Sequence, residues 1–172
     1  MATLIARSAA VANTLPIGGT SPALEQNLLE MVGRNKCPVM RSAADVADAF
    51  AETIWLKRNV LLAATIDRSR RLIHWEMLAG TRAALRDLCP ASAFSGVMHS
   101  HGYGVILVQN HRSGRLEFDA AGRAVTRAVA HAGLLLGYPL VDHVIISQTG
   151  YLSVLSVALS QRHYWARRSR AS

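Results

Sequence analysis

Cysteine is scarce in this sequence, and so are acidic residues and long apolar runs. The two cysteines, Cys37 and Cys89, are too few for a disulfide framework or a cysteine-ligated zinc finger, which favours a reducing, cytoplasmic compartment. The longest apolar runs, such as residues 105–108, are far too short to cross a bilayer, so we expect no membrane association. The 51% hydrophobic content excludes a disordered chain, and 172 residues are enough for one domain.

Positive charge is in excess and is concentrated towards the end of the chain. Nineteen Lys and Arg residues against eleven Asp and Glu give a net charge of +8, and no acidic residue follows Asp142. Residues 161–172 interleave arginines with two aromatic residues, a mixture that can hold phosphates and stack bases. A solvated terminus that keeps the protein soluble explains the same pattern equally well. The arginines of this basic C-terminal tail are Arg162, Arg167, Arg168 and Arg170.

Helical and strand-like patterns alternate along the chain without an internal repeat. The spacing of apolar residues and the capping signals predict helices over 23–32, 42–54, 91–99 and 120–136, and strands over 60–66, 72–78, 105–108, 140–146 and 151–157. This alternation predicts one α/β domain. We expect an N-terminal extension with one short helix over 1–36, the domain over 37–160, and the basic tail over 161–172.

Several segments of the chain carry a family resemblance. They read CPVMRSAADVADAF, NVLLAATIDRSRRLIHWEMLAGT, CPASAFSGVMHSHGYG, VILVQNHRSG and LLLGYPLVDHVIIS. Together they resemble the RadC family, whose members carry a JAB/MPN metalloprotease-like domain, over roughly Cys37 to Leu155. The resemblance implies a JAB/MPN-type (cytidine-deaminase-like) fold, in which a mixed sheet is flanked by helices. We expect a chain without the helix-hairpin-helix region that precedes this domain in longer family members.

Active members of the RadC family carry a His-Asn-His-Pro-Ser-Gly loop, followed by a serine and, three residues later, an aspartate. In those proteins the two histidines and the aspartate hold one zinc ion, and water is the fourth ligand. A glutamate from an earlier strand takes the proton of this water, whose pKa the zinc lowers. The serine helps to stabilise the developing oxyanion.

Most of these positions are altered in this sequence. Gln109 stands at the first histidine, Gly122 at the aspartate and Asn59 at the glutamate, while His111 is kept and Asp119 replaces the serine. An amide is a poor zinc ligand, glycine offers no side chain, and asparagine cannot take a proton. The resemblance therefore implies a degenerate site and a pseudoenzyme.

Three residues could still rebuild a metal site, and two of them have a second interpretation. Asp119 precedes a predicted helix, so we favour an N-cap over a zinc ligand, with Glu117 as the next candidate ligand. His111 is more typical of a hydrogen-bonded loop histidine than of a lone ligand.

In the pair Asp142-His143, strand alternation turns one side chain inward, where we expect a structural hydrogen bond.

The loop after residues 105–108 also gains positive charge. Arg112 and Arg115 replace a proline and an acidic residue of the family loop, and Arg123 follows about one turn into the predicted helix. These three arginines would make the pocket cationic, which suits phosphate, carboxylate or nucleic acid.

We therefore predict a non-catalytic RadC-like protein without a cofactor, which binds nucleic acid or another protein. Inactive members of this fold are commonly scaffolds or dimer partners, so self-association or pairing with an active homologue belongs to this hypothesis. The alternative is a zinc-dependent metalloprotease or isopeptidase-type hydrolase, whose rearranged site uses His111 and Asp119. A third interpretation keeps the DNA-repair role of the family label.

Overall fold

The computed structural model describes residues 37–51, 53, 59–80, 87–111 and 116–156. In chain order, its elements are α3 (Ala43–Ala49), β1 (Leu61–Ile66), β2 (Leu72–Ala79), the 3-10 helix η2 (Pro90–Phe94), α5 (Ser95–Ser100), β3 (Gly104–Asn110), α6 (Ala120–Leu136), β4 (Leu140–Ser147) and β5 (Gly150–Ser153). The predicted helix over 23–32 and the basic tail lie outside the described residues. The boundaries at 36/37 and 160/161 therefore stay predictions.

The five strands form one mixed sheet in the order β2-β1-β3-β4-β5. β1 pairs antiparallel with both β2 and β3, β4 pairs antiparallel with β5, and β3 and β4 are parallel. A parallel pair needs a crossover connection, and α6 provides it between β3 and β4. The predicted mixed sheet flanked by helices is confirmed.

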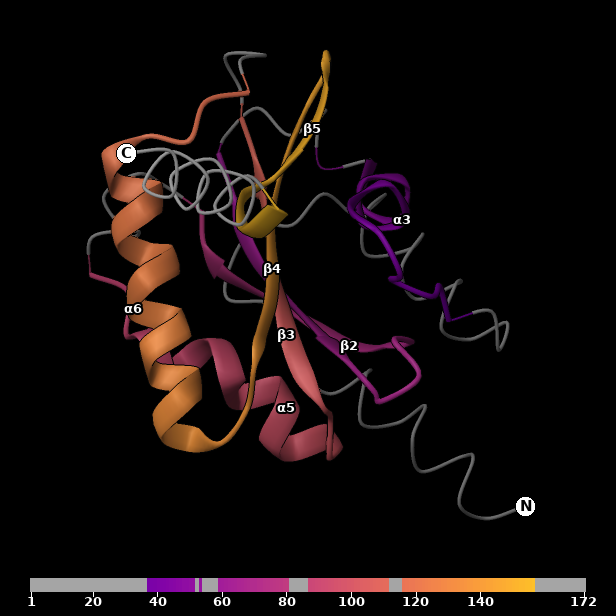
Figure 1. The fold of residues 1–172 in the computed structure, drawn as a ribbon, viewed down its shortest axis with the longest axis vertical. Coiled ribbons are helices and arrows are strands. Elements are labelled where there is room, and N and C mark those ends of the chain that lie inside the picture. Colours follow the sequence, from indigo (N-terminus) through magenta and orange to yellow (C-terminus); the bar gives the residue numbers. More distant parts are fainter. Residues whose placement is uncertain (1–36, 52, 54–58, 81–86, 112–115, 157–172) are drawn as a thin grey trace, which may run out of the picture.

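Helices cover both faces of this sheet, as Figure 1 shows. α3 lies on one face, over a core that includes Phe50 and Ile106. η2, α5 and α6 lie on the other face, over a core that includes Phe94, Leu107 and Val129. All residues of β1 and β3 are buried, because side chains of alternating direction meet one core or the other. Among the described residues, no helix is both long and apolar enough to span a bilayer.

The predicted strand over 151–157 is wrong in its second half. β5 ends at Ser153, and residues 154–156 are helical. The Ser153 hydroxyl oxygen accepts the backbone N–H of Ser156 at 3.2 Å, as a helix N-cap does. Asp142 fixes this bend, because its carboxylate accepts from the Ser153 hydroxyl at 2.7 Å and from the Leu155 N–H at 3.3 Å. These capping bonds outweigh the strand preference of the apolar run.

Two predicted helices differ from the observed ones in their internal geometry. The helix over 91–99 begins as η2, where Ser92 N–H donates to Cys89 C=O, three residues back, at 3.0 Å. It then continues as α5. The helix over 42–54 is shorter as an α-helix, because α3 ends at Ala49 and Thr53 N–H donates to Phe50 C=O at 2.9 Å. In both segments a bond spanning three residues replaces the α-helical bond spanning four.

Candidate functional site

The described residues singled out by the family resemblance lie at three points of the fold. They lie at the end of β3, just before β1 and at the start of α6. Leu61 of β1 pairs with Gln109, and Asn110 N–H donates to Val60 C=O at 3.3 Å. Continuing this register by one residue brings Asn59 to the same end of the sheet as His111.

Gln109 and His111 occupy the two histidine positions of the family motif. Gln109 faces the α6 side of the sheet, as Leu107 of the same core does, and it is only 7% exposed. His111 is half-buried just beyond β3, and its backbone N–H donates to Ile146 C=O of β4 at 3.0 Å. The site therefore presents one amide and one imidazole where the family has two imidazoles.

Asn110, between these two residues, has a structural role that the sequence did not reveal. Its side-chain Oδ1 accepts the backbone N–H of Val60 at 2.6 Å, and its Nδ2 donates to Thr53 C=O at 2.7 Å. Asn110 is 1% exposed, so both bonds satisfy backbone groups in the protein interior. This side chain therefore joins the end of β3 to the chain that leads into β1.

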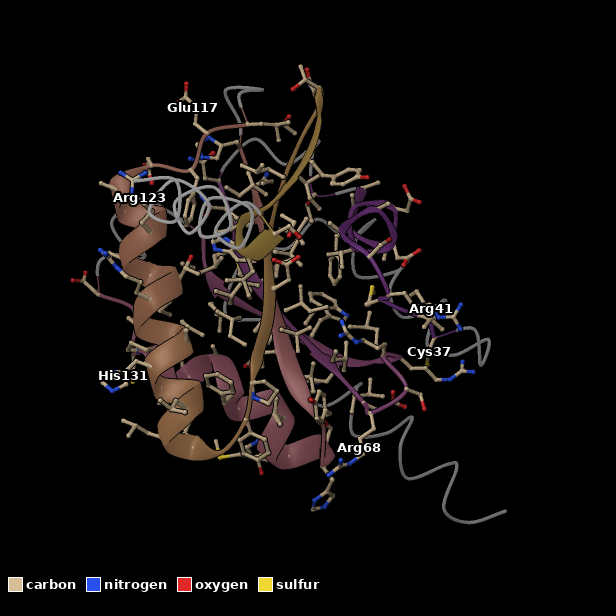
Figure 2. The ribbon with its side chains drawn as sticks, in the orientation of Figure 1. Cys37, Arg41, Arg68, Glu117, Arg123 and His131 are labelled. Carbon is tan, nitrogen blue, oxygen red and sulfur yellow. The ribbon has the colours of Figure 1, made fainter. Side chains whose placement is uncertain are left out.

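Asp119 is the N-cap of α6, as predicted. Its backbone is extended, and its Oδ1 accepts the N–H of Gly122 at 2.7 Å. Glu117, the second candidate ligand, is exposed and points outward at the end of the molecule where α6 begins (Figure 2). The carboxylate of Asp119 is thus directed to the helix backbone.

Gly122, at the position of the ligand aspartate, is buried in the first turn of α6. A Cβ atom added there would lie 3.3 Å from Asp119 Oδ1 and 3.3 Å from Phe118 Cδ2. The Phe118 ring is held in this place by Arg123, whose Nη1 donates to Phe118 C=O at 2.6 Å and whose guanidinium lies 5.9 Å from the ring centroid. A side chain at 122 would therefore have to displace the ring or the cap by a few tenths of an ångström.

The Asp119 cap gives a prediction that separates capping from metal binding. We expect Asp119→Ala to lower the free energy of unfolding by about 1 kcal/mol, and Asp119→Asn to be nearly neutral, because an amide oxygen caps as well as a carboxylate. Urea denaturation of both variants measures this difference. Equal destabilisation by the two substitutions, accompanied by loss of a bound metal, would contradict the cap assignment.

His143 lies beneath Phe118 in the protein interior. Its ring is edge-on to the Phe118 ring, with centroids 5.9 Å apart, and the residue is 0% exposed. The Thr126 hydroxyl lies 2.8 Å from Gly122 C=O and 2.7 Å from His143 Nδ1. Since a hydroxyl has one hydrogen, which Thr126 donates to Gly122, His143 Nδ1–H must be the donor to Thr126. The expected structural hydrogen bond of the Asp142-His143 pair is therefore made by His143.

This tautomer leaves His143 Nε2 unprotonated and buried, with no hydrogen-bond partner among the described residues. Burial lowers the pKa of His143 to about 4, because the interior disfavours the charged imidazolium. His143 is consequently neutral at physiological pH and supports the first turn of α6.

The described residues at this end of the sheet do not include a set of zinc ligands. Within the described part of the chain, no group of three or more His, Cys, Asp or Glu side chains is placed to hold a metal ion. Of the cationic candidates, Arg123 is described and exposed. The others, Arg112, Arg115 and the four tail arginines, lie outside the described residues, so the cationic pocket stays a prediction.

Comparison with known proteins identifies the relatives of this chain. A family model for the RadC-like JAB domain matches residues 40–159. A UPF0758 protein of Thermotoga maritima is 31% identical over 112 residues, which cover 65% of this chain and 50% of that protein. A UPF0758 protein of Rubrobacter xylanophilus is 30% identical over 118 residues (68% and 52%), and one of Trichormus variabilis is 24% identical over 170 residues (93% and 70%). The chain spans about half the length of the first two relatives.

Proposed function

Since the chain belongs to the RadC-like JAB domain family, we propose that it is a non-catalytic member that acts by binding protein or nucleic acid. The observation that carries this proposal is Gly122. It has no donor atom, and the space beside it is filled by Phe118 and by the capping carboxylate of Asp119. A third protein ligand for zinc is therefore missing from the position that should supply it.

Two further positions support the same proposal. Gln109 offers a neutral amide, which is a weak zinc ligand, and Asn59 has no basic group that could take a proton from water. Each of these functions requires a positioned group, so one compensating substitution would not restore hydrolysis. His111 remains as the single imidazole of the motif.

We expect the purified full chain to retain much less than one equivalent of zinc. After incubation with one equivalent of zinc and gel filtration, elemental analysis should find the same residual metal in the natural chain and in His111→Ala. A zinc-dependent isopeptidase assay on the same samples should give no rate above the blank, since no described group can generate a metal-bound hydroxide.

A restored variant provides the positive control for this measurement. Asn59→Glu, Gln109→His and Gly122→Asp together recreate the donor set of active members, and this triple variant should retain zinc. Near-stoichiometric zinc in the natural chain that is lost in His111→Ala would overturn the proposal in favour of the rearranged hydrolase.

The proposal also covers self-association, a DNA-repair role and the location of the protein. Self-association and pairing with an active homologue both agree with a domain that has kept its fold and lost its ligands. A DNA-repair role would in addition require nucleic-acid binding, for which the tail arginines are the sequence-based candidates. A reducing, cytoplasmic location agrees with Cys37 and Cys89, which are both free thiols.

A further inference from the structure

Helix α6 has a wider apolar surface than the described part of the chain covers. Its buried residues Gly122, Thr126, Val129 and Gly133 follow a helical repeat and face the sheet. At 100° per residue, the apolar arc of this helix continues from that line as far as Ala124, through roughly 200°. About 100° is enough for a helix that packs on one neighbour. Val125 and Ala132 still contact the core, so only the outer part of this arc is left uncovered by the described residues.

The rest of this arc, beyond the buried line, forms a continuous stripe along the helix. Most of its members are half-buried. Ala124 and Leu135, on the side of the helix turned away from the sheet, are exposed, and Leu135 is 76% exposed. Their spacing is that of the contact face of a helix that packs against another helix. The stripe consists of Ala121, Ala124, Val125, Ala128, Ala132 and Leu135.

A groove runs along the first half of this stripe. Leu88 and Pro90, just before and at the start of η2, form one wall, and Ala121, Ala124 and Ala128 form the other. The cavity has a volume of about 310 Å³. Small alanine side chains on one wall allow a second helix to approach closely, and Leu and Pro on the other give it apolar contact.

The outer edge of the stripe is basic. Arg123, Arg127 and His131 follow one another at intervals of four residues, and each is exposed. In Figure 2, Arg123 and His131 project from the side of α6 that faces away from the sheet. The sequence of α6 contains no acidic residue that could balance them. An occupant of the groove would thus be favoured by acidic residues along this edge.

We propose that this groove binds an amphipathic helix of a partner protein, whose apolar stripe packs between α6 and Leu88–Pro90 and whose acidic residues face Arg127 and His131. This inference rests on the proposed binding function and names the surface that performs it. If α6 of a second copy occupied the groove, the basic edges of the two helices would face each other, and the repulsion between like charges would cost free energy. The basic tail fits no better, because residues 157–172 contain no acidic residue.

A pair of designed peptides tests the proposal on the full chain. The first is a labelled 18-residue helical peptide with leucine at the stripe positions and glutamate beside them. The second is identical except that lysine replaces every glutamate. In fluorescence anisotropy titrations, we expect saturable binding of the glutamate peptide and at least roughly tenfold weaker binding of the lysine peptide.

Two matched pairs of variants locate the binding surface. Ala128→Gln places a polar side chain in the groove and should weaken binding of the glutamate peptide severalfold, whereas Ala130→Gln, on the opposite edge of α6, should leave it unchanged. Arg127→Glu should reduce the preference for the glutamate peptide. Arg68→Glu makes the same change of charge in the β1–β2 turn and should have no such effect.

Several outcomes would overturn the proposal. They are equal binding of the two peptides, equal loss in Ala128→Gln and Ala130→Gln, a dimer in light scattering that Ala128→Gln abolishes, and peptide binding that emerges only when residues 157–172 are deleted. The last two results would assign the groove to a second copy or to the tail. Zinc retention tests the proposed function separately, so a failure of either idea is distinguishable from a failure of the other.

Discussion

Acidification from pH 7 to pH 4 should remove about 3 kcal/mol of stability through one side chain, His143. Burial lowers the pKa of His143 to about 4 in the folded protein, against about 6.5 for an unfolded histidine. Below pH 6.5 the unfolded chain therefore gains a proton that the folded chain cannot accept until about pH 4. The stability due to neutral His143 is complete above pH 6.5 and decreases as the pH falls towards 4.

Urea denaturation at intervals of pH between 4 and 7.5 measures this effect. In His143→Gln, the loss of unfolding free energy between pH 7 and pH 4 should be smaller by about 3 kcal/mol, because glutamine does not titrate. Burial also lowers the pKa of His74, with a smaller effect from nearby His99, so part of the slope should persist in His143→Gln. An unaltered slope in His143→Gln would refute the assignment.

If His143→Gln does not fold, Thr126 offers a second route to the same hydrogen bond. Thr126→Val keeps the shape of the side chain but removes the acceptor for His143 Nδ1–H. We expect this variant to be less stable than Thr126→Ser, which keeps the hydroxyl, at every pH above 6.5. The comparison measures the contribution of the Thr126 hydroxyl, which bonds to both Gly122 C=O and His143 Nδ1–H.

Replacing Asn110 by alanine should lower the free energy of unfolding by about 4 kcal/mol. The substitution leaves Val60 N–H and Thr53 C=O without their side-chain partner, and both lie in the protein interior. An unsatisfied buried polar group costs about 1–3 kcal/mol, and here there are two. The effect would be large for one side chain, because Asn110 joins the end of β3 to the chain that leads into β1.

Asn110→Asp is the matched control, since it keeps the size of the side chain and the acceptor for Val60 N–H. It loses the donor to Thr53 C=O and sets a carboxylate against this oxygen. A protonated carboxyl can donate, so Asn110→Asp should regain stability as the pH falls, while Asn110→Ala should not. Chemical denaturation of both variants at pH 5 and pH 7.5 gives the comparison. A loss below about 1 kcal/mol in Asn110→Ala would show that the two bonds are not needed.

The elements that local signals define were predicted most accurately from sequence. Both ends of α6 were predicted correctly, because Asp119 caps the start and Gly137 adopts the left-handed conformation that ends a helix, with φ of 77°. Strand β1 was recognised from its continuous apolar run. The end of β5 was missed, since its termination depends on Asp142, eleven residues before Ser153.

In the candidate site too, the positions of residues were predicted from sequence, whereas the hydrogen bonds between residues far apart in the chain were not. The positions of Asn59, Gln109, His111 and Gly122 were inferred from the family resemblance, and the strand register brings the first three to one end of the sheet. The bonds of Asn110 and the pair Thr126–His143 were not predicted. They join residues 50, 57 and 17 positions apart, and no local pattern identifies such partners.

The two edge strands of the sheet, β2 and β5, each limit the addition of a foreign strand in a different way. The open side of β2 is covered at its start by residues 38–40, where Leu72 N–H donates to Pro38 C=O at 2.9 Å, and its register with β1 shifts twice. At the opposite edge of the sheet, β5 is only four residues long. The short β5 and the paired start of β2 leave less unpaired backbone to a foreign strand, which disfavours edge-to-edge pairing at these two places in the native state.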